Sequence, residues 1–397
     1  MTVHDLVLTG GTVIDPASGL HGRRDIGISG GHITAIESHI PGGDAADVID
    51  VTGAYVVPGL IDLHVHVYPG VADLSVEPDP TCLGRGATTV VDAGSAGANT
   101  FPGFRRYVIE PSRGRILAYL NISLLGQVDT MLGELHDLRF ADPDRAARVA
   151  LANPDVIVGF KVRLSEMLAG PNGLEGLRLA LEAGEATGLP VMAHIGGTPF
   201  DIEEALALFR SGDVVTHTFT GWQPGALIDD AGRVVAAARE ARVRGVHFDV
   251  GHGQGSFTWS VAEAAMADGF RPDTISTDLH RFNIASPVGD LPTTMSKFLL
   301  LGCTLDEVVA MTTTAAAGAL GPVGHTLGRL TVGGAADVTV LRLEEGRVDL
   351  VDARGDVREA RQRLVPLAVV RDGRRVAIQP LLSEPPAGAS PPPGAGR

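Results

Sequence analysis

The stretch PGLIDLHVH at residues 58–66 joins an apolar strand pattern to two histidines at its carboxyl end. Seven further β-rich runs follow it, separated by Ala-, Leu-, Glu- and Arg-rich stretches of helical period. The eight runs are 60–67, 87–94, 116–123, 156–163, 190–197, 213–220, 245–252 and 273–280. Eight strands alternating with helices predict a (β/α)8 TIM barrel over residues 58–330. An open doubly wound sheet is the alternative, but no GxGxxG motif follows the first strand.

Two β-rich segments flank the predicted barrel. Residues 1–57 alternate apolar and polar residues around glycine-bearing turns, and a similar pattern returns over 331–382. We expect both segments to build one small β-sandwich domain. The last segment, SEPPAGASPPPGAGR at 383–397, has almost nothing to bury, and its composition predicts a disordered tail.

The composition of the 397-residue chain restricts its partners. A net charge of -15 would repel a phosphate backbone, which argues against nucleic-acid binding. No apolar run approaches the length of a membrane span, and the N-terminus lacks a secretory signal pattern, so we expect a soluble cytoplasmic protein that binds no membrane. Two cysteines offer no thiolate metal site. A monomer and a homo-oligomer both stay open.

Polar side chains gather at the predicted carboxyl ends of the strands. His64 and His66 lie two residues apart, so strand alternation points both to the same side. The corresponding ends of later strands carry Lys161, His194, His217 and Asp278, and His252 follows the seventh strand. Because barrel sites lie at this end, we expect these groups to gather at one site, where His64 and His66 could together bind a metal ion.

The chain contains only two lysines, Lys161 and Lys297. Lys161 lies in the apolar run VIVGFKVR, where an uncompensated ammonium would be costly to bury. A salt bridge is one solution; the other is a lowered pKa, so that the neutral amine reacts with CO2 to give a carbamate that could bridge two cations. Such ligands suit Zn²⁺, although Mn²⁺, Fe²⁺ and Co²⁺ would also accept them. Lys297 could be a surface residue, a contact at the rim of the site or a member of a buried pair.

On these motifs the chain resembles the amidohydrolase superfamily over nearly its whole length. The resemblance rests on PGLIDLHVH at 58–66, Lys161, His194, His217 and STD at 276–278, in that order. It implies two divalent metal ions, with zinc as the preferred metal. His64, His66 and Asp278 would bind the more buried ion, His194 and His217 the more exposed ion, and carboxylated Lys161 would bridge both.

The expected mechanism follows from this arrangement. Two cations would lower the pKa of a bridging water, so that hydroxide is available near neutrality, and the exposed ion would polarise a substrate carbonyl. Asp278 would accept the proton of the hydroxide and pass it to the leaving oxygen or nitrogen, acting first as a base and then as an acid.

The substrate is predicted from details near the ligands. Dihydroorotases often carry arginine where this chain has Tyr68, which argues against that activity. Arg163 lies two residues beyond Lys161, so it should face the same mouth, where it could clamp a carboxylate or form a structural ion pair. We therefore expect a small anionic organic substrate. Further candidates for shaping the pocket are Tyr68, His252, Ser256 and His280.

The motifs HVHVYPG, GFKVR, THTFTG, GHGQGSF and STDLH resemble the amidohydrolase/deacetylase subfamily, some members of which deacetylate α-acetoxy acids such as acetyl-mandelate. The resemblance implies a deacetylase that cleaves an acetyl ester or amide of a small α-substituted carboxylic acid. A cyclic amidohydrolase of the dihydroorotase or hydantoinase kind is the enzymatic alternative. A non-catalytic barrel scaffold is the third hypothesis, but scaffolds of this kind usually lose metal ligands, and all six are present here.

Overall fold

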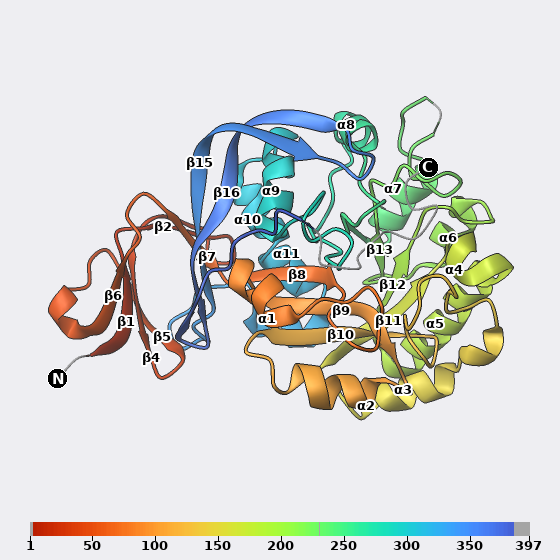
Figure 1. Cartoon of the computed structure of the whole chain (residues 1–397), viewed down its shortest axis with the longest axis horizontal. Helices are drawn as coiled ribbons and strands as arrows, with labels where there is room; N and C mark the ends of the chain where they lie inside the picture. The colour runs from red at the N-terminus through yellow and green to blue at the C-terminus, as the bar shows by residue number, and fades with distance from the viewer. Residues whose placement is uncertain (1–2, 230, 385–397) are drawn as a thin grey trace.

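The computed structural model describes residues 3–229 and 231–384, so most of the predicted tail at 383–397 lies outside the described residues (Figure 1). Its centre is a curled sheet of seven parallel strands in the order β14-β13-β12-β11-β10-β9-β8. The strands are β8 (Leu60–Val65), β9 (Ala87–Gly97), β10 (Arg115–Asn121), β11 (Ile157–Arg163), β12 (Val191–His194), β13 (Val214–Thr216) and β14 (His247–Asp249). Parallel pairing in chain order defines a TIM-barrel-like α/β fold.

The structure assigns only isolated bridges, and no continuous strand, to residues 273–280, where the sequence predicts the eighth strand. Two isolated parallel bridges, Asp249 with Thr274 and Val65 with Leu279, place this segment between the edge strands β14 and β8. Hydroxyl groups of the segment bond to buried aspartates rather than completing a ladder: Ser276 donates to Asp249. The backbone of Asp278 is also left-handed, with φ 49°, which an extended strand does not allow.

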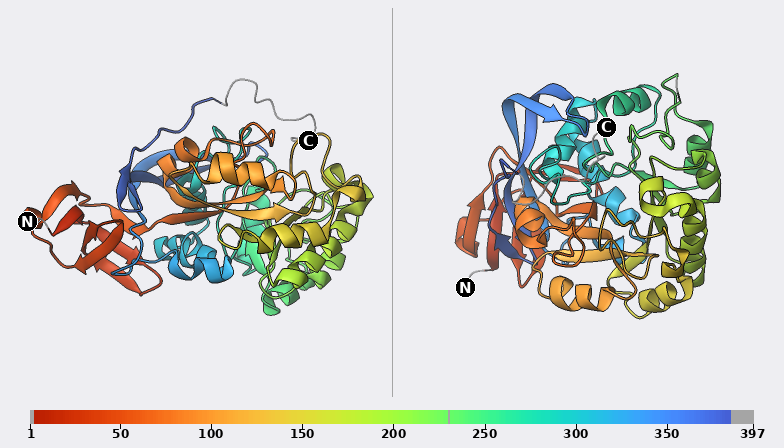
Figure 2. Two further views of the ribbon diagram at one scale, coloured as in Figure 1. Left: turned by 90° about the horizontal axis from the view of Figure 1, so that it is seen from below. Right: turned by 45° about the vertical axis from the view of Figure 1, so that its right-hand side comes forward.

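Helices follow the strands and cover the outside of the sheet (Figures 1 and 2). They are α1 (Pro78–Thr81), α2 (Phe101–Phe104), α3 (Pro143–Leu151), α4 (Glu166–Ala169), α5 (Gly173–Thr187), α6 (Ile202–Leu208), α7 (Ala236–Val243), α8 (Trp259–Ala267), α9 (Leu291–Leu300), α10 (Leu305–Met311) and α11 (Thr314–Gly318). Several begin at capping side chains: Asp142 accepts from the backbone N–H of Arg145 at α3, and Asp290 from that of Thr293 at α9. No helix among the described residues is long and apolar enough to span a bilayer.

Strands from both ends of the chain share a second sheet, in the order β17-β16-β15-β7-β2-β3. Its members are β2 (Thr12–Asp15), β3 (Leu20–Arg23), β7 (Tyr55–Pro58), β15 (Val338–Val351), β16 (Val357–Arg371) and β17 (Arg374–Val376). A four-stranded sheet, β5-β4-β1-β6, holds β1 (His4–Thr9), β4 (Asp25–Ser29), β5 (His32–Glu37) and β6 (Ala45–Asp50). Leu8 and Ile26 of the four-stranded sheet belong to the same apolar cluster as Val56 and Val338 of the other, so one core joins the two sheets.

Candidate metal centre

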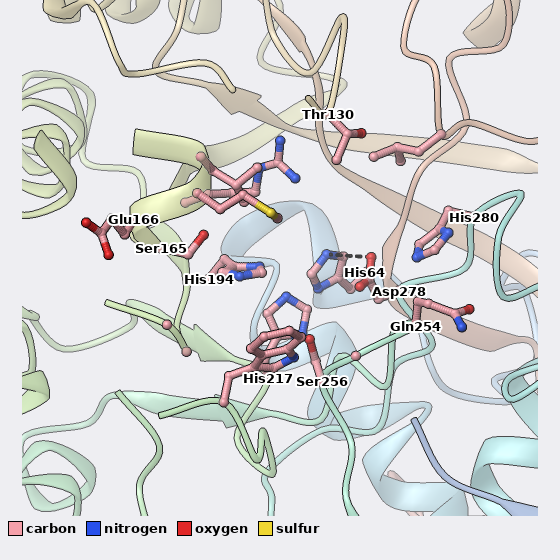
Figure 3. Close-up of a pocket in the computed structure, with 18 of the residues that line it drawn as sticks. His64, Thr130, Ser165, Glu166, His194, His217, Gln254, Ser256, Asp278 and His280 are labelled. Atoms are coloured by element: carbon pink, nitrogen blue, oxygen red, sulfur yellow. Dashed lines mark ion pairs between the residues drawn. The ribbon is translucent and has the colours of Figure 1, made fainter. Parts of the chain in front are cut away.

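A pocket opens where the parallel strands end, and most of the predicted site residues line it (Figure 3). The predicted residues that it contains are His64, His66, Lys161, Arg163, His194, His217, Ser256, Asp278 and His280. Tyr68 and His252 do not line it. The six proposed metal ligands are spread over more than 200 residues of the chain, from His64 to Asp278, and the fold brings them to one cavity.

Short distances connect the groups at the bottom of this pocket. Oδ1 of Asp278 lies 3.3 Å from Nε2 of His64 and 3.1 Å from Nε2 of His66. One ligand atom each of His64, His217 and Asp278 can be chosen so that all three lie within 4.8 Å of one another. The ring centroids of His194 and His217 are 4.3 Å apart. Figure 3 shows His64, His194, His217 and Asp278 converging on one centre.

The hydrogen bonds of His64 decide which of its ring nitrogens carries the proton. Nδ1 lies 2.9 Å from Oγ1 of Thr216, and that hydroxyl donates its only proton to Asp249 at 2.8 Å. Nδ1 must therefore donate, which leaves a lone pair on Nε2. This lone pair faces the carboxylate oxygen of Asp278 at 3.3 Å. A cation between these two acceptors would satisfy both of them, whereas Nζ of Lys161 approaches Nε2 only at 3.4 Å, so the site fits a divalent metal ion.

His217 also presents a free ring nitrogen to the centre. Nδ1 of His217 lies 2.6 Å from the carbonyl oxygen of Gly251, which can only accept, so Nε2 of His217 carries the lone pair. Burial lowers the pKa of His217 to about 4 and that of His66 to about 3, and it lowers the pKa of His64 and His194 well below the usual range. All four rings are neutral at physiological pH, as metal ligation requires.

Lys161 is 1 % exposed, and its Nζ lies 3.4 Å from Nε2 of His64. Burial lowers the pKa of this amine to about 7, although the nearby Asp278 charge acts in the opposite direction. Gly94 makes room for the side chain: a Cβ at this position, where φ is 89°, would lie 2.7 Å from Cβ and Cγ of Lys161. The amine is thus held at the edge of the metal centre with a pKa close to neutrality, so a substantial fraction of it is uncharged near pH 7.

Asp278 takes its place through an uncommon backbone conformation. Its φ is 49°, and its backbone N–H donates to the carbonyl oxygen of His64 at 2.7 Å. The Nδ2 of Asn283 donates to the Asp278 carbonyl oxygen at 2.7 Å. A Cβ at Gly253 would lie 2.5 Å from Oδ2 of Asp278, so only glycine fits beside this carboxylate. Left-handed backbone at a non-glycine residue is often found at functional sites, where the surrounding structure enforces it.

Buried aspartates support the ligands from behind, and sequence reasoning did not single them out. Asp249 accepts from the hydroxyls of Thr216, Thr274 and Ser276 at 2.8, 2.7 and 2.6 Å. Asp62 accepts from the backbone and the hydroxyl of Thr277 at 3.0 and 2.6 Å. Burial raises the pKa of both carboxyl groups, that of Asp62 to about 7, while these bonds oppose the rise. The sequence did contain an indication of their role. Asp62 and Asp249 both lie within predicted strand runs, where a carboxylate is costly to bury without hydrogen-bond partners.

Arg163 lies on the pocket wall, as strand alternation predicted, but two of its donors are taken. Nε and Nη2 of Arg163 bond to the two carboxylate oxygens of Glu134, the second at 2.6 Å, and both side chains are buried. Within the described part of the chain, Nη1 of Arg163 has no hydrogen bond. The structural ion pair therefore exists, and one edge of the guanidinium stays available to a ligand. Glu134 was not foreseen, because it lies in an irregular segment 29 residues earlier.

The remaining predicted residues differ in their positions. His280 lines the pocket, and burial lowers its pKa to about 4. Ser256 also lines it, next to Gln254 and Gly255.

Two predicted residues lie outside the pocket. Tyr68 lies away from it because β8 ends at Val65 and the chain turns, so that the Tyr68 hydroxyl donates to the Thr100 carbonyl oxygen at 3.0 Å. His252 is fully buried behind the pocket wall. Apolar side chains that were not predicted form much of the lining: Leu74, Met167, Leu168, Trp222 and Phe282.

Comparison with known proteins identifies the class that this fold and site define. The sequence pattern of the Amidohydrolase family matches residues 55–376. A deacetylase of Agrobacterium fabrum is 39 % identical over 355 residues, which cover 89 % of this chain and 86 % of that protein. A deacetylase of Enterococcus faecalis is 33 % identical over 352 residues, which cover 88 % of this chain and 94 % of that protein. The chain belongs to the amidohydrolase family and is a hydrolase.

Solved structures agree with this assignment. The crystal structure of a dihydroorotase has a TM-score of 0.89 and 35 % identity, covering 96 % of this chain and 99 % of that one. The crystal structure of an adenine deaminase has a TM-score of 0.86 and 32 % identity, covering 94 % and 99 %. A D-hydantoinase at 17 % identity and a TM-score of 0.66 shares the fold. Members of this family generally use divalent metal ions, which agrees with the group His64, His217 and Asp278.

Proposed function

We propose that this protein is a metal-dependent deacetylase that cleaves an acetyl ester or amide of a small α-substituted carboxylic acid. The observation that carries a metal-dependent hydrolysis is the approach of the His64 Nε2 lone pair to the Asp278 carboxylate at 3.3 Å. Relatives named deacetylase, at 33–39 % identity over most of the chain, support the removal of an acetyl group.

The proposed cofactors are two divalent ions, with zinc as the preferred metal, and CO2 bound as a carbamate on Lys161. His64, His66 and Asp278 would hold one ion, His194 and His217 the other, and the Lys161 carbamate would contribute to both. The neutral imidazoles and the pKa of about 7 of the Lys161 amine support this assignment. When bound, such ions make water acidic and polarise a carbonyl group.

The residues of the chain would then have separate tasks. Asp278 would accept a proton from the attacking water and deliver it to the leaving oxygen or nitrogen, because its carboxylate reaches the centre of the ligand set. His280, which is neutral and lies in the pocket beside Asp278, would border the leaving group (Figure 3). The apolar wall with Trp222 and Phe282 would exclude water from the substrate.

An anionic substrate is part of the proposal. The free Nη1 edge of Arg163 would donate to a substrate carboxylate, while Glu134 holds the guanidinium in place. Ser256 would add a hydroxyl donor from the pocket wall, where Figure 3 places it below Asp278. The apolar lining would accept the α-substituent of the acid.

The finer description of the fold is also a proposal. We infer that residues 273–280 complete a (β/α)8 barrel over 58–330, since bridges connect them to both edge strands. Residues 1–57 and 331–382 would form a small β-sandwich domain, since the two sheets share one apolar cluster.

The decisive experiment is a panel of O-acetyl and N-acetyl carboxylic acids of both hands, incubated with zinc-loaded protein and assayed for acetate release. Turnover of at least one of them, abolished by a chelator and restored by zinc, is the expected result. Asp278→Asn, tested at equal metal content, is the matched control. Acetate release that survives both the chelator and this substitution would point to a contaminating hydrolase.

The second candidate is a cyclic amidohydrolase, which the dihydroorotase structure at 35 % identity favours. Dihydroorotate and hydantoins therefore belong in the same panel. Ring opening without any acetate release would replace the deacetylase assignment. A non-catalytic scaffold would purify without stoichiometric metal and turn over none of these compounds.

A further inference from the structure

Lys297 is the second of the two lysines in the chain, and the proposed chemistry gives it no task. It lies on α9 and is 0 % exposed, outside the lining of the metal pocket. Its Nζ is 2.6 Å from Nε2 of His252, 2.9 Å from the Pro287 carbonyl oxygen and 2.6 Å from the Val351 carbonyl oxygen. These three acceptors match the three donors of an ammonium group. Lys297 thus joins three segments that are distant in sequence.

The tautomer of His252 shows that Lys297 is the donor in this contact. Nδ1 of His252 lies 3.0 Å from the Gly253 carbonyl oxygen, which can only accept, so the ring proton is on Nδ1 and Nε2 is a bare acceptor. The imidazole also stacks on Phe257, with ring centroids 4.6 Å apart and an interplanar angle of 18°. The bond from Lys297 and the stacking together fix the orientation of the ring.

His252 belongs to the pocket loop, residues 251–257, whose other face borders the site. Gln254, Gly255 and Ser256 line the pocket. A Cβ at Gly255 would lie 2.8 Å from Nε1 of Trp222, so the loop packs directly against this wall residue. Lys297 therefore contacts the back of the loop that forms part of the substrate-facing wall.

The tip of the β15–β16 hairpin supports the same loop. The backbone N–H of Ala353 donates to the Phe257 carbonyl oxygen at 2.9 Å, and Asp352 accepts from the backbone N–H of Trp259 at 2.9 Å. Arg354 donates to the Gly221 carbonyl oxygen at 2.6 Å, next to Trp222. Figure 1 shows this hairpin arching over α9 toward α8. The Val351 carbonyl oxygen that Lys297 binds lies at the base of this tip.

We propose that Lys297 is a positioning residue for substrate binding, which fixes the pocket loop by bonding His252 to the hairpin tip. It touches no substrate and acts through Gln254, Gly255 and Ser256. The kinetic part of this inference rests on the proposed function, whereas the structural part does not.

The test compares Lys297→Met with Ser296→Ala in zinc-loaded protein. Ser296 is the preceding residue on α9, and its hydroxyl accepts from the backbone N–H of Leu364, so it also joins α9 to the hairpin, but away from the pocket loop. For Lys297→Met we expect unchanged metal content and a loss of about 10- to 100-fold in kcat/KM, mainly through KM. Ser296→Ala should lower the melting temperature and leave KM unchanged.

A second readout needs no substrate. The chain has two tryptophans, and Trp222 reports on the wall that the pocket loop covers. Acrylamide should quench the fluorescence of Lys297→Met more strongly than that of the wild type. This increase should be absent when Trp222→Phe is added. If no acetyl compound is turned over, the proposed function fails, but the quenching experiment still decides the role of Lys297.

Variants of His252 keep the test decisive if Lys297→Met does not fold. His252→Leu removes the acceptor, whereas His252→Gln keeps one, so the glutamine variant should restore most of the KM and quenching changes seen with leucine. The double variant Lys297→Met/His252→Leu should raise KM no further than Lys297→Met alone, because Lys297→Met already removes the bond to His252. A lowered melting temperature with wild-type KM and wild-type quenching in Lys297→Met or His252→Leu would overturn the proposal and leave a purely structural lysine.

Discussion

The hydroxyl oxygen of Thr216 lies 2.9 Å from Nδ1 of His64. Because the same hydroxyl donates to Asp249 at 2.8 Å, a chain of hydrogen bonds runs from a buried carboxylate to a proposed metal ligand. Such partners of ligating histidines fix the ring orientation and raise the basicity of the coordinating nitrogen. The position of His64 is thus set from behind by Thr216, which is not one of the proposed metal ligands.

Thr216→Val should weaken metal binding by about 10- to 100-fold, because valine keeps the shape and removes the bond to His64. Competition with a chelator measures the affinity. Thr274→Val is the matched control, since it removes a different hydroxyl from Asp249 and leaves His64 untouched. Equal affinities of the two variants would show that the hydroxyl of Thr216 does not support the ligand.

Asp278→Asn should retain metal and lose about 10²- to 10⁴-fold in kcat, because the amide cannot accept and return a proton. Asparagine tolerates the left-handed backbone of this position, where φ is 49°. The substitution therefore tests the loss of the carboxylate charge without a change in backbone conformation. Single-turnover kinetics at measured metal content checks the prediction. Near-normal turnover would show that proton transfer runs through another group.

Lys161→Ala should lose both metal and activity, because the bridging carbamate cannot form. Added short carboxylic acids should restore part of both by occupying the space that the side chain leaves beside His64. Metal analysis after gel filtration, with and without acetate or propionate, provides the measurement. A variant that stays active without such acids would contradict the carbamate.

Reconstitution of metal-free protein should depend on pH through Lys161. Burial lowers the pKa of this amine from 10.5 to about 7, and only the neutral amine reacts with CO2. The neutral fraction is then about one tenth at pH 6 and about nine tenths at pH 8. At a fixed concentration of dissolved CO2 with zinc present, the rate of recovery should rise with pH around a midpoint near 7. A midpoint near 10 would show that the buried amine has an ordinary pKa.

Arg163→Met should lower the free energy of unfolding by about 3–5 kcal/mol, because it leaves the carboxylate of Glu134 buried without a partner. The double variant Arg163→Met/Glu134→Leu should be more stable than Arg163→Met alone, since no uncompensated charge remains. Guanidinium titration measures both. Arg178→Met is the control, because its exposed pair with Glu175 should contribute less than about 1 kcal/mol.

Local patterns in the sequence predicted the parts of the site that strands position. Strand alternation placed Lys161 and Arg163 on the same wall, and both line the pocket. The parallel order of the first seven strands followed from the alternation of β-rich and helical stretches. These features depend on residue spacing within single elements, which one sequence contains.

Contacts between segments that are distant along the chain could not be predicted from the sequence. Glu134 lies in an irregular stretch, and nothing in its neighbourhood marks it as the partner of Arg163. Residues 273–280 have the composition of a strand, yet their hydroxyls bond to Asp249 and Asp62, which only the folded chain brings near. The three interpretations of Lys297 could be separated only by the placement of His252 and Val351.

The pairing of β7 with β15 has a consequence for the synthesis of the protein. Val338 of β15 lies opposite Pro58 of β7. The edge of β7 that faces β15 is therefore paired only after residues 59–337 have left the ribosome. At about 5–20 residues per second, this leaves the edge of an N-terminal strand uncovered for tens of seconds. An uncovered β-edge can recruit strands of other chains. Nascent chains that stop before residue 338 should therefore aggregate or bind chaperones through β7. The exposure ends when β15 pairs with this strand.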